Sequence, residues 1–237
     1  MQEYTKKILV TGFPHSGTTI LRAMVGKCES VYDNHIEFED PANYNPNSPY
    51  KFYVWKHPTL PAIIRNNGYS IKDTNYLSDT IIIQIIRNPW NTFTSLYKRQ
   101  IAFNEFSIFD NENGHSLQYW ENSAHCFLEN EENSYKDVYT IKYEDMFLDN
   151  FQKLKNIFNN IGLEYSDDIF TNNKVLKHND SEYIKNYNET GEIGESYRTW
   201  QINQPFQNMN GKVDLPDEFS DMLEKSNNAK LLGYSTN

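Results

Sequence analysis

Residues 7–25 read KILVTGFPHSGTTILRAMV, and this stretch decides the fold class. It begins with a short apolar run, residues 7–11, that is typical of a buried strand. A glycine-containing turn follows, and apolar residues then recur at the spacing of one helical face. Those residues are Ile20, Leu21, Met24 and Val25. A strand, a glycine-containing turn and a helix in this order are typical of a phosphate-binding loop.

Later segments of the chain predict alternating strands and helices. Apolar runs at residues 52–56, 80–86 and 138–141 predict strands. The run TIIIQII at 80–86 is nearly continuous in β-branched residues, so we expect a central strand buried on both faces. Helical spacing follows at 89–101 and 151–161. The pattern predicts an α/β fold: a three-layer α/β/α domain with a mainly parallel central sheet and a P-loop-like phosphate-binding loop.

Two polar stretches interrupt this pattern. Residues 40–49, DPANYNPNSP, are rich in turn-forming residues and predict a loop that could cover a site as a lid. Periodicity fades between residues 171 and 210, where we expect only irregular structure. We interpret residues 1–237 as a single domain, because 38% hydrophobic and 23% charged residues are typical of one globular core.

Charge and cysteine content argue against several classes of protein. A formal net charge of -10 argues against nucleic-acid binding, which needs a basic surface. Cys28 and Cys126 are too few and too far apart for a disulfide framework or a zinc site, which favours a reducing compartment. The polar start of the chain lacks a signal-peptide pattern, and no apolar run approaches the roughly 20 residues of a membrane span. We therefore expect a cytoplasmic protein that binds neither nucleic acid nor membrane.

The phosphate-type loop differs from that of a nucleoside triphosphatase in one position. Residues 12–19 read GFPHSGTT, with Thr18 where a triphosphatase has its lysine. The strand at 80–86 is followed by Arg87, where a Walker B strand would end in an aspartate that holds Mg²⁺. The loop amides can still bind a 5′-phosphate at the helix N-terminus. The two absences disfavour a metal-assisted kinase.

Two segments resemble the donor-binding segments of the sulfotransferase family, which uses 3′-phosphoadenosine 5′-phosphosulfate (PAPS). They are PHSGTT at 14–19 and IIRNPWNTFTSLYKR at 85–99. The resemblance implies that the first segment surrounds the 5′-phosphosulfate, with Pro14, His15, Ser16, Gly17, Thr18 and Thr19. It implies that Arg87 and Ser95 hold the 3′-phosphate. Arg87 ends a strand and Ser95 lies about two turns into the next helix, so both can point at one phosphate above the sheet.

The resemblance extends to later segments and has one departure. KYEDM at 142–146 is similar to the family's Tyr-Glu-Asp segment, which implies that Tyr143 lies beside the adenine. YRTW at 197–200 and LLGY at 231–234 resemble the C-terminal region, which implies that Arg198 closes over the 3′-phosphate. The family usually has Lys or Arg where this chain has His15. That side chain steadies the bridging oxygen, a role that histidine can fill with a hydrogen bond.

The general base has three candidates, of which Glu37 is the first, His57 the second and His35 the third. Glu37 lies where one branch of the family carries a carboxylate base. Residues 55–58, WKHP, loosely resemble the Lys-x-His stretch of cytosolic members, but Lys56 and His57 are adjacent. Adjacent residues of a strand face opposite sides, so only one of the two can face the site. Lys56 is a candidate partner of the transferring sulfuryl oxygens. Each histidine could instead be structural, and a carboxylate beside a loop is usually solvated.

The expected activity is transfer of a sulfuryl group from PAPS to a hydroxyl or amine of an acceptor, with release of adenosine 3′,5′-bisphosphate (PAP). An in-line displacement with a general base needs no metal. Two alternatives remain open: a P-loop nucleotide kinase or phosphotransferase, and a non-catalytic protein that binds PAP. A small molecule or saccharide is the expected acceptor. The sequence indicates neither its identity nor the oligomeric state.

Overall fold

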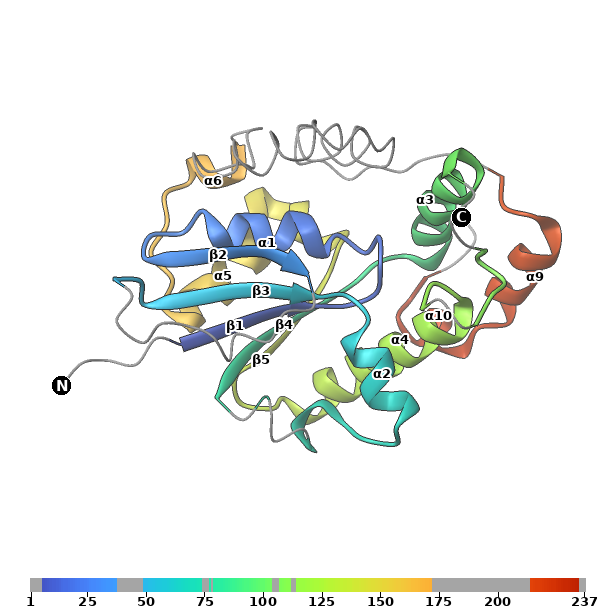
Figure 1. Ribbon diagram of the computed structural model, residues 1–237, viewed down its shortest axis with the longest axis horizontal. Helices are drawn as coiled ribbons and strands as arrows, with labels where there is room; N and C mark the ends of the chain where they lie inside the picture. The colour runs from blue at the N-terminus through green and yellow to red at the C-terminus, as the bar shows by residue number, and fades with distance from the viewer. Residues whose placement is uncertain are drawn as a thin grey trace.

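A central parallel sheet organises the protein. The computed structural model describes residues 6–37, 49–73, 77, 79–103, 107–111, 114–171 and 214–234. Within these ranges five strands form one sheet in the order β2-β3-β1-β4-β5, and every neighbouring pair is parallel (Figure 1). The strands are β1 (Lys6–Thr11), β2 (Val31–Glu37), β3 (Phe52–His57), β4 (Thr80–Ile86) and β5 (Val138–Lys142). The predicted α/β fold class is confirmed.

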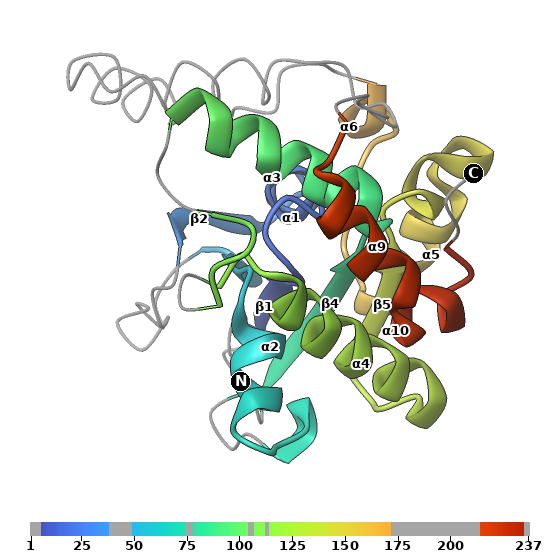
Figure 2. The same cartoon turned by 90° about the vertical axis from the view of Figure 1, so that its right-hand side faces the viewer.

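Helices lie on both faces of the sheet and beyond its carboxyl edge (Figures 1 and 2). The longer helices are α1 (Thr18–Gly26), α3 (Pro89–Phe103), α4 (Leu117–Asn133), α5 (Gln152–Ile161) and α9 (Asp217–Lys225). The shorter ones are α2 (Leu60–Asn66), α6 (Asp168–Thr171), α10 (Asn227–Leu231) and the 3₁₀ segments η2 (Ile71–Asp73) and η4 (Asp145–Phe151). None of the helices in the described ranges is both long and apolar enough to cross a bilayer.

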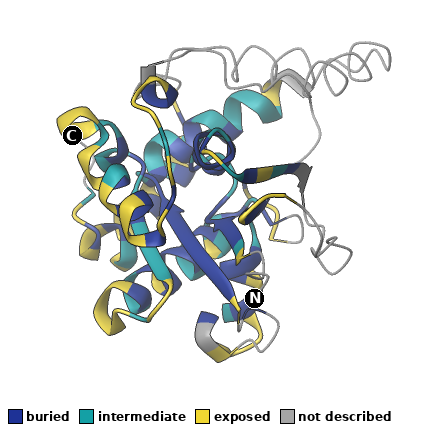
Figure 3. Cartoon of the chain, turned by 90° about the vertical axis from the view of Figure 1, so that its left-hand side faces the viewer, coloured by how far each residue is buried: buried dark blue, intermediate teal, exposed yellow. Residues whose placement is uncertain are grey.

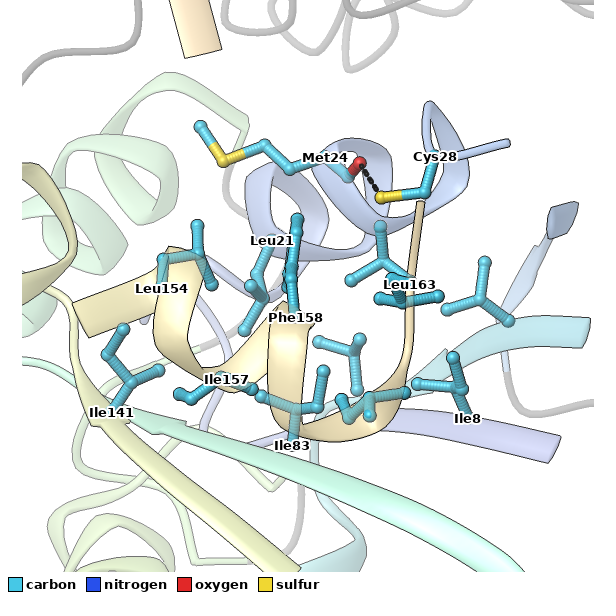
Figure 4. Packing of buried hydrophobic residues seen from close by; sticks show 14 of the residues in the cluster. Ile8, Leu21, Met24, Cys28, Ile83, Ile141, Leu154, Ile157, Phe158 and Leu163 are labelled. Carbon is cyan, nitrogen blue, oxygen red and sulfur yellow. Dashed lines mark hydrogen bonds between the residues drawn. The ribbon is translucent and has the colours of Figure 1, made fainter. Parts of the chain in front are cut away.

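One face of the sheet packs against α1 and α5. Figure 4 shows this core, in which Leu21 of α1 and Phe158 of α5 lie above Ile8 and Ile83 of the sheet. Each of these four side chains is fully buried. Apolar residues at helical spacing on α5 and at alternate positions on the strands meet across this face, as the sequence pattern predicts.

The opposite face of the sheet is covered by α2 and α4. Leu9 of β1 and Trp55 of β3 point to this side and pack with Leu60 of α2. Cys126 of α4 also belongs to this cluster, and burial raises the pKa of its thiol to about 12. A further cluster joins α3, α4 and α9 and includes Trp120. Figure 3 shows the consequence, a sheet whose central strands are buried on both faces.

The strand order places the phosphate-type loop at the centre of the carboxyl edge. β1 lies between β3 and β4. Because all strands run in the same direction, the ends of β2, β3 and β4 meet the loop after β1 at one edge. Ligands of open α/β sheets bind at this edge, where the strand order reverses.

Several predicted elements agree with the structure, and others were not anticipated. The strand at 80–86 has the predicted bounds, whereas β3 and β5 each extend one residue further than predicted. The sequence pattern missed β2, α2 and α4. β2 contains the polar residues Asp33 and Asn34 and therefore lacks an apolar run; Asp33 is paired inside the protein with Arg22 of α1, at 2.8 Å. The predicted lid at 40–49, except Pro49, and the irregular segment from 172 to 210 lie outside the described residues.

Candidate active site

The loop between β1 and α1 curves tightly over the carboxyl edge. His15 has φ of 64° and Gly17 has φ of 97°, both in the left-handed region. The Ser16 amide donates to the Phe13 carbonyl at 3.0 Å, and the Leu21 amide donates to the Gly17 carbonyl at 3.0 Å. The second bond begins α1. The loop thus delivers the chain directly into a helix N-terminus.

Close packing explains both glycines of the loop. A Cβ on Gly12 would overlap the carbonyl oxygen of Ile85 in β4. A Cβ on Gly17 would overlap the ring of Tyr143 and come within 2.8 Å of its Cε2 atom. Gly17 also needs its positive φ, which other residues adopt at a cost. The glycine frame therefore fits this loop against β4 and Tyr143.

The loop has the properties of an anion site. Ser16 is fully buried, and its Oγ atom has no hydrogen-bond partner among the described residues. Among the described residues no side chain caps the N-terminus of α1, and the first turn of α1 contains no acidic residue. The first amides of a helix and its dipole favour an anion, and a buried hydroxyl without a partner is costly unless a ligand or water meets it. A phosphate fits this set of donors.

Arg87 connects the loop to the segment after β4. Its Nη1 atom donates to the His15 carbonyl oxygen at 3.3 Å, and its Cζ atom lies 4.5 Å from the centre of the Tyr143 ring. The His15 Nδ1 atom lies 2.8 Å from the Ser95 Oγ atom. Arg87 and Tyr143 are buried. The structure thus brings together His15, Arg87, Ser95 and Tyr143, which the sequence analysis selected from three distant segments.

Lys56 meets the loop from the other side. Its Nζ atom donates to the Thr19 Oγ1 atom at 2.5 Å, and the side chain is buried. Lys56 shares a face of β3 with Val54, which packs against α1, whereas Trp55 packs against α2. His57 follows on the Trp55 side, and its carbonyl oxygen accepts a hydrogen bond from Thr11 Oγ1 at 2.7 Å. Lys56, and not His57, therefore points to the first turn of α1.

The remaining candidates are placed only by their backbone or not at all. Glu37 ends β2 and pairs in the sheet with Lys56, and His35 lies two positions earlier on the same strand. Their side chains lie outside the description. Arg198 falls in the range 172–213, which the structure does not describe.

Two residues at this edge received no role from the sequence analysis, although both lie in segments that it selected. Glu144 follows Tyr143 in KYEDM, and its Oε1 atom accepts from the Asn88 amide at 2.9 Å. Its Oε2 atom accepts from the Tyr234 hydroxyl, in LLGY, at 3.0 Å. Both residues lie in motifs that resemble family segments, but only the structure shows that Glu144 and Tyr234 form a hydrogen bond.

The sequence was compared with models of protein families and with curated proteins, and the family comparison gave a match. Residues 70–167 match a model described as the sulfotransferase family. A search of curated proteins gave no significant match.

The solved structures share the fold at low sequence identity. The sulfotransferase domain of the Synechococcus PCC 7002 olefin synthase is 12% identical, covers 99% of this chain and 97% of its own, and superposes with a TM-score of 0.56. The sulfotransferase domain from the curacin biosynthetic pathway is 13% identical over 98% of both chains, with a TM-score of 0.53. A retinol dehydratase in complex with androsterone and PAP is 16% identical, covers 94% of this chain and 80% of its own, and has a TM-score of 0.52.

The matched residues include much of the site. They contain β4, α3 and β5, and with them Arg87, Ser95 and Tyr143. The fold supplies the loop after β1 that these residues contact. Residues 70–167 thus resemble the sulfotransferase family in sequence, and the chain shares its fold with solved sulfotransferase domains.

Proposed function

We propose that this protein transfers a sulfuryl group from PAPS to a hydroxyl or amine of an acceptor. One observation carries the proposal: the loop with Thr18 in place of a P-loop lysine converges with Arg87 and Ser95 at the N-terminus of α1. A donor with a 5′-phosphate, a 3′-phosphate and no γ-phosphate matches these groups. The family match agrees with this reading.

The residues of the loop would hold the 5′ end of the donor. Buried Ser16 Oγ and the backbone amides at the start of α1 are the donors that would meet an anion at this helix N-terminus. Arg87 and Ser95 would hold the 3′-phosphate, and Arg198 would close over it. Bound PAPS supplies an activated sulfuryl group on its 5′-phosphate.

Tyr143 was assigned to the adenine by resemblance, and its contacts suggest an additional role. Its ring is only 2% exposed and packs on Arg87, Gly17 and Phe147. The cation–π contact holds the guanidinium plane of Arg87 in one orientation. We infer that the main role of Tyr143 is to hold the Arg87 guanidinium in place. Only the edge of its buried ring would be left to contact the adenine.

The chemical step would use residues on both sides of the loop. A general base takes the proton of the acceptor, and the acceptor oxygen or nitrogen forms the new bond to sulfur as the bond to the 5′-phosphate oxygen breaks. Lys56 donates to the sulfuryl oxygens, where negative charge must be stabilised. His15 donates to the oxygen that leaves with PAP. Glu37 remains our first choice as the base, because β2 ends beside Lys56; His57 is second and His35 third.

The acceptor is proposed as a small molecule or saccharide. Complexes of retinol dehydratase contain retinol or androsterone together with PAP. A protein of this fold thus binds a small organic molecule together with PAP. A panel of alcohols, phenols, amines and sugars with labelled PAPS would identify the acceptor.

Thermal unfolding with nucleotides tests the proposal. PAP at 100 times its dissociation constant should stabilise the fold by about 2.7 kcal/mol through mass action, and PAPS should act similarly. ATP with Mg²⁺ at the same concentration should have little effect. A larger shift with ATP and Mg²⁺ would instead favour the phosphotransferase alternative. Stabilisation by PAP without transfer to any acceptor of the panel would favour the non-catalytic binder.

A further inference from the structure

The segment 214–234 returns to the carboxyl edge of the sheet. α9 packs on α3, where the rings of Phe93 and Phe219 lie 4.7 Å apart, and α10 packs on α4 (Figure 2). The Asn228 side-chain amide donates to the Glu121 backbone carbonyl of α4 at 3.0 Å. These contacts hold the residues after α10 close to the β4–α3 junction.

Two hydrogen bonds fasten the end of this segment to the last residue of β5 and to a residue just after it. The Tyr234 hydroxyl donates to Glu144 Oε2 at 3.0 Å. The Lys142 Nζ atom donates to the Leu232 carbonyl oxygen at 2.6 Å and lies 5.5 Å from the centre of the Tyr234 ring. Burial, and then the charge of Glu144, raise the pKa of Tyr234, so its hydroxyl remains a donor at neutral pH.

The other oxygen of Glu144 holds the junction that carries Arg87. The Asn88 amide, one residue after Arg87, donates to Glu144 Oε1 at 2.9 Å. The Asn88 Oδ1 atom accepts from the Trp90 amide at 2.9 Å and so begins α3, the helix that contains Ser95. One carboxylate thus bridges the turn between Arg87 and α3 to Tyr234.

We propose that Glu144 is a positioning residue that, held by Tyr234, fixes the backbone at Asn88 and thereby aligns Arg87 with its phosphate. The proposal rests on the proposed function for the identity of that phosphate. Arg87 reads a phosphate through a planar fork of donors, so a small rotation of its backbone costs binding. Glu144 acts through Asn88 and does not touch the nucleotide.

Removal of the Tyr234 hydroxyl tests this role with little change of shape. We expect Tyr234→Phe to weaken PAP binding roughly three- to tenfold, as for loss of one hydrogen bond, and to leave binding of adenosine 5′-phosphate within twofold. Titration calorimetry measures both affinities. Tyr165→Phe is the matched control, because the Tyr165 hydroxyl donates to Asn159 at 3.3 Å on the surface; it should change neither affinity.

Variants of Glu144 give a second, graded test. Glu144→Gln keeps an oxygen that accepts from the Asn88 amide, so it should bind PAP more tightly than Glu144→Ala. Hydrogen exchange of the backbone at residues 86–92 should be faster in Tyr234→Phe than in the wild type. This readout needs no nucleotide.

The outcomes separate this proposal from the proposed function. A lower melting temperature in Tyr234→Phe with an unchanged ratio of PAP to adenosine 5′-phosphate affinity would mean a purely structural contact and overturn the proposal. If the wild type binds both nucleotides equally, the 3′-phosphate role of Arg87 is wrong. Exchange at residues 86–92 then decides: faster exchange in Tyr234→Phe supports the positioning of the junction, and unchanged exchange overturns it.

Discussion

The two sides of the loop after β1 hold their cations in different ways. On the β4 side, Arg87 lies over the Tyr143 ring and donates to the backbone of His15. On the β3 side, Lys56 donates a short hydrogen bond to the Thr19 side chain. Both cations are buried. The Arg87 guanidinium is thus held by a cation–π contact and by a hydrogen bond to a backbone carbonyl. The Lys56 ammonium group is smaller, and its aliphatic chain has several rotatable bonds.

This difference suggests a division of labour. A planar guanidinium held in one orientation suits recognition of a fixed phosphate. An ammonium group with rotatable donors can follow oxygens whose positions change during transfer. Changes on the β3 side should therefore act mainly on turnover, and changes on the β4 side mainly on nucleotide affinity.

The general base should give the largest effect on the β3 side. We expect Glu37→Gln to reduce turnover roughly 10²- to 10⁴-fold, because the acceptor then keeps its proton in the transition state. PAP affinity should stay near that of the wild type. Steady-state kinetics with labelled PAPS and calorimetry with PAP measure the two quantities.

His57→Ala is the comparison for this prediction. If Glu37→Gln retains nearly full activity and His57→Ala loses it, the base is on β3 and not on β2, and our ranking is wrong. A loss of PAP affinity in either variant would place that residue on the donor side of the site.

Lys56→Met should have the next largest effect. Loss of one donor to the developing charge should reduce turnover by about 10²- to 10³-fold while PAP binding changes little. Lys51→Met is the matched control, because Lys51 forms an exposed ion pair with Glu164 at 2.9 Å. A large loss of PAP affinity in Lys56→Met, with turnover retained, would contradict the division of labour.

Arg87→Ala should have the smallest of the three effects, and it should appear in affinity. Loss of a charge-assisted hydrogen bond, about 1.5 to 3 kcal/mol, should weaken PAP binding roughly 10- to 150-fold. Adenosine 5′-phosphate, which lacks the 3′-phosphate, should bind nearly as before. Arg65→Ala, which removes a partly exposed cation 3.8 Å from Glu129, is the control. Equal losses for both nucleotides would show that Arg87 supports the fold.

The sequence predicted several strands and helices of the fold, and it selected His15, Arg87, Ser95 and Tyr143, which the structure brings together. β1, β4, α1 and the start of α3 carry their information locally, in apolar runs, a glycine frame and Pro89 at the first position of a helix. β2 was missed because its polar residues are satisfied by a tertiary ion pair, Arg22 with Asp33, that no local pattern reveals.

The connections within the site could not be predicted from local patterns. His15 and Ser95 meet because β1 and β4 are neighbours in the sheet. Glu144 meets Tyr234 because α9 and α10 return over α3 and α4. The sequence showed that either Lys56 or His57 faces the site, but not which one. Side chains alternate along a strand, and this alternation does not reveal which face of the sheet carries α1.

The return of the segment 214–234 also sets an order of assembly during synthesis. The loop after β1 and the turn at Asn88 leave the ribosome long before Tyr234 does, since a chain is made from its N-terminus. Until Tyr234 arrives, Glu144 lacks the hydrogen bond from its hydroxyl, and the cluster of α3 and α4 lacks Phe219. A nascent chain can therefore form the sheet early, but its Arg87 turn reaches its final contacts only after residues 214–234 have been made.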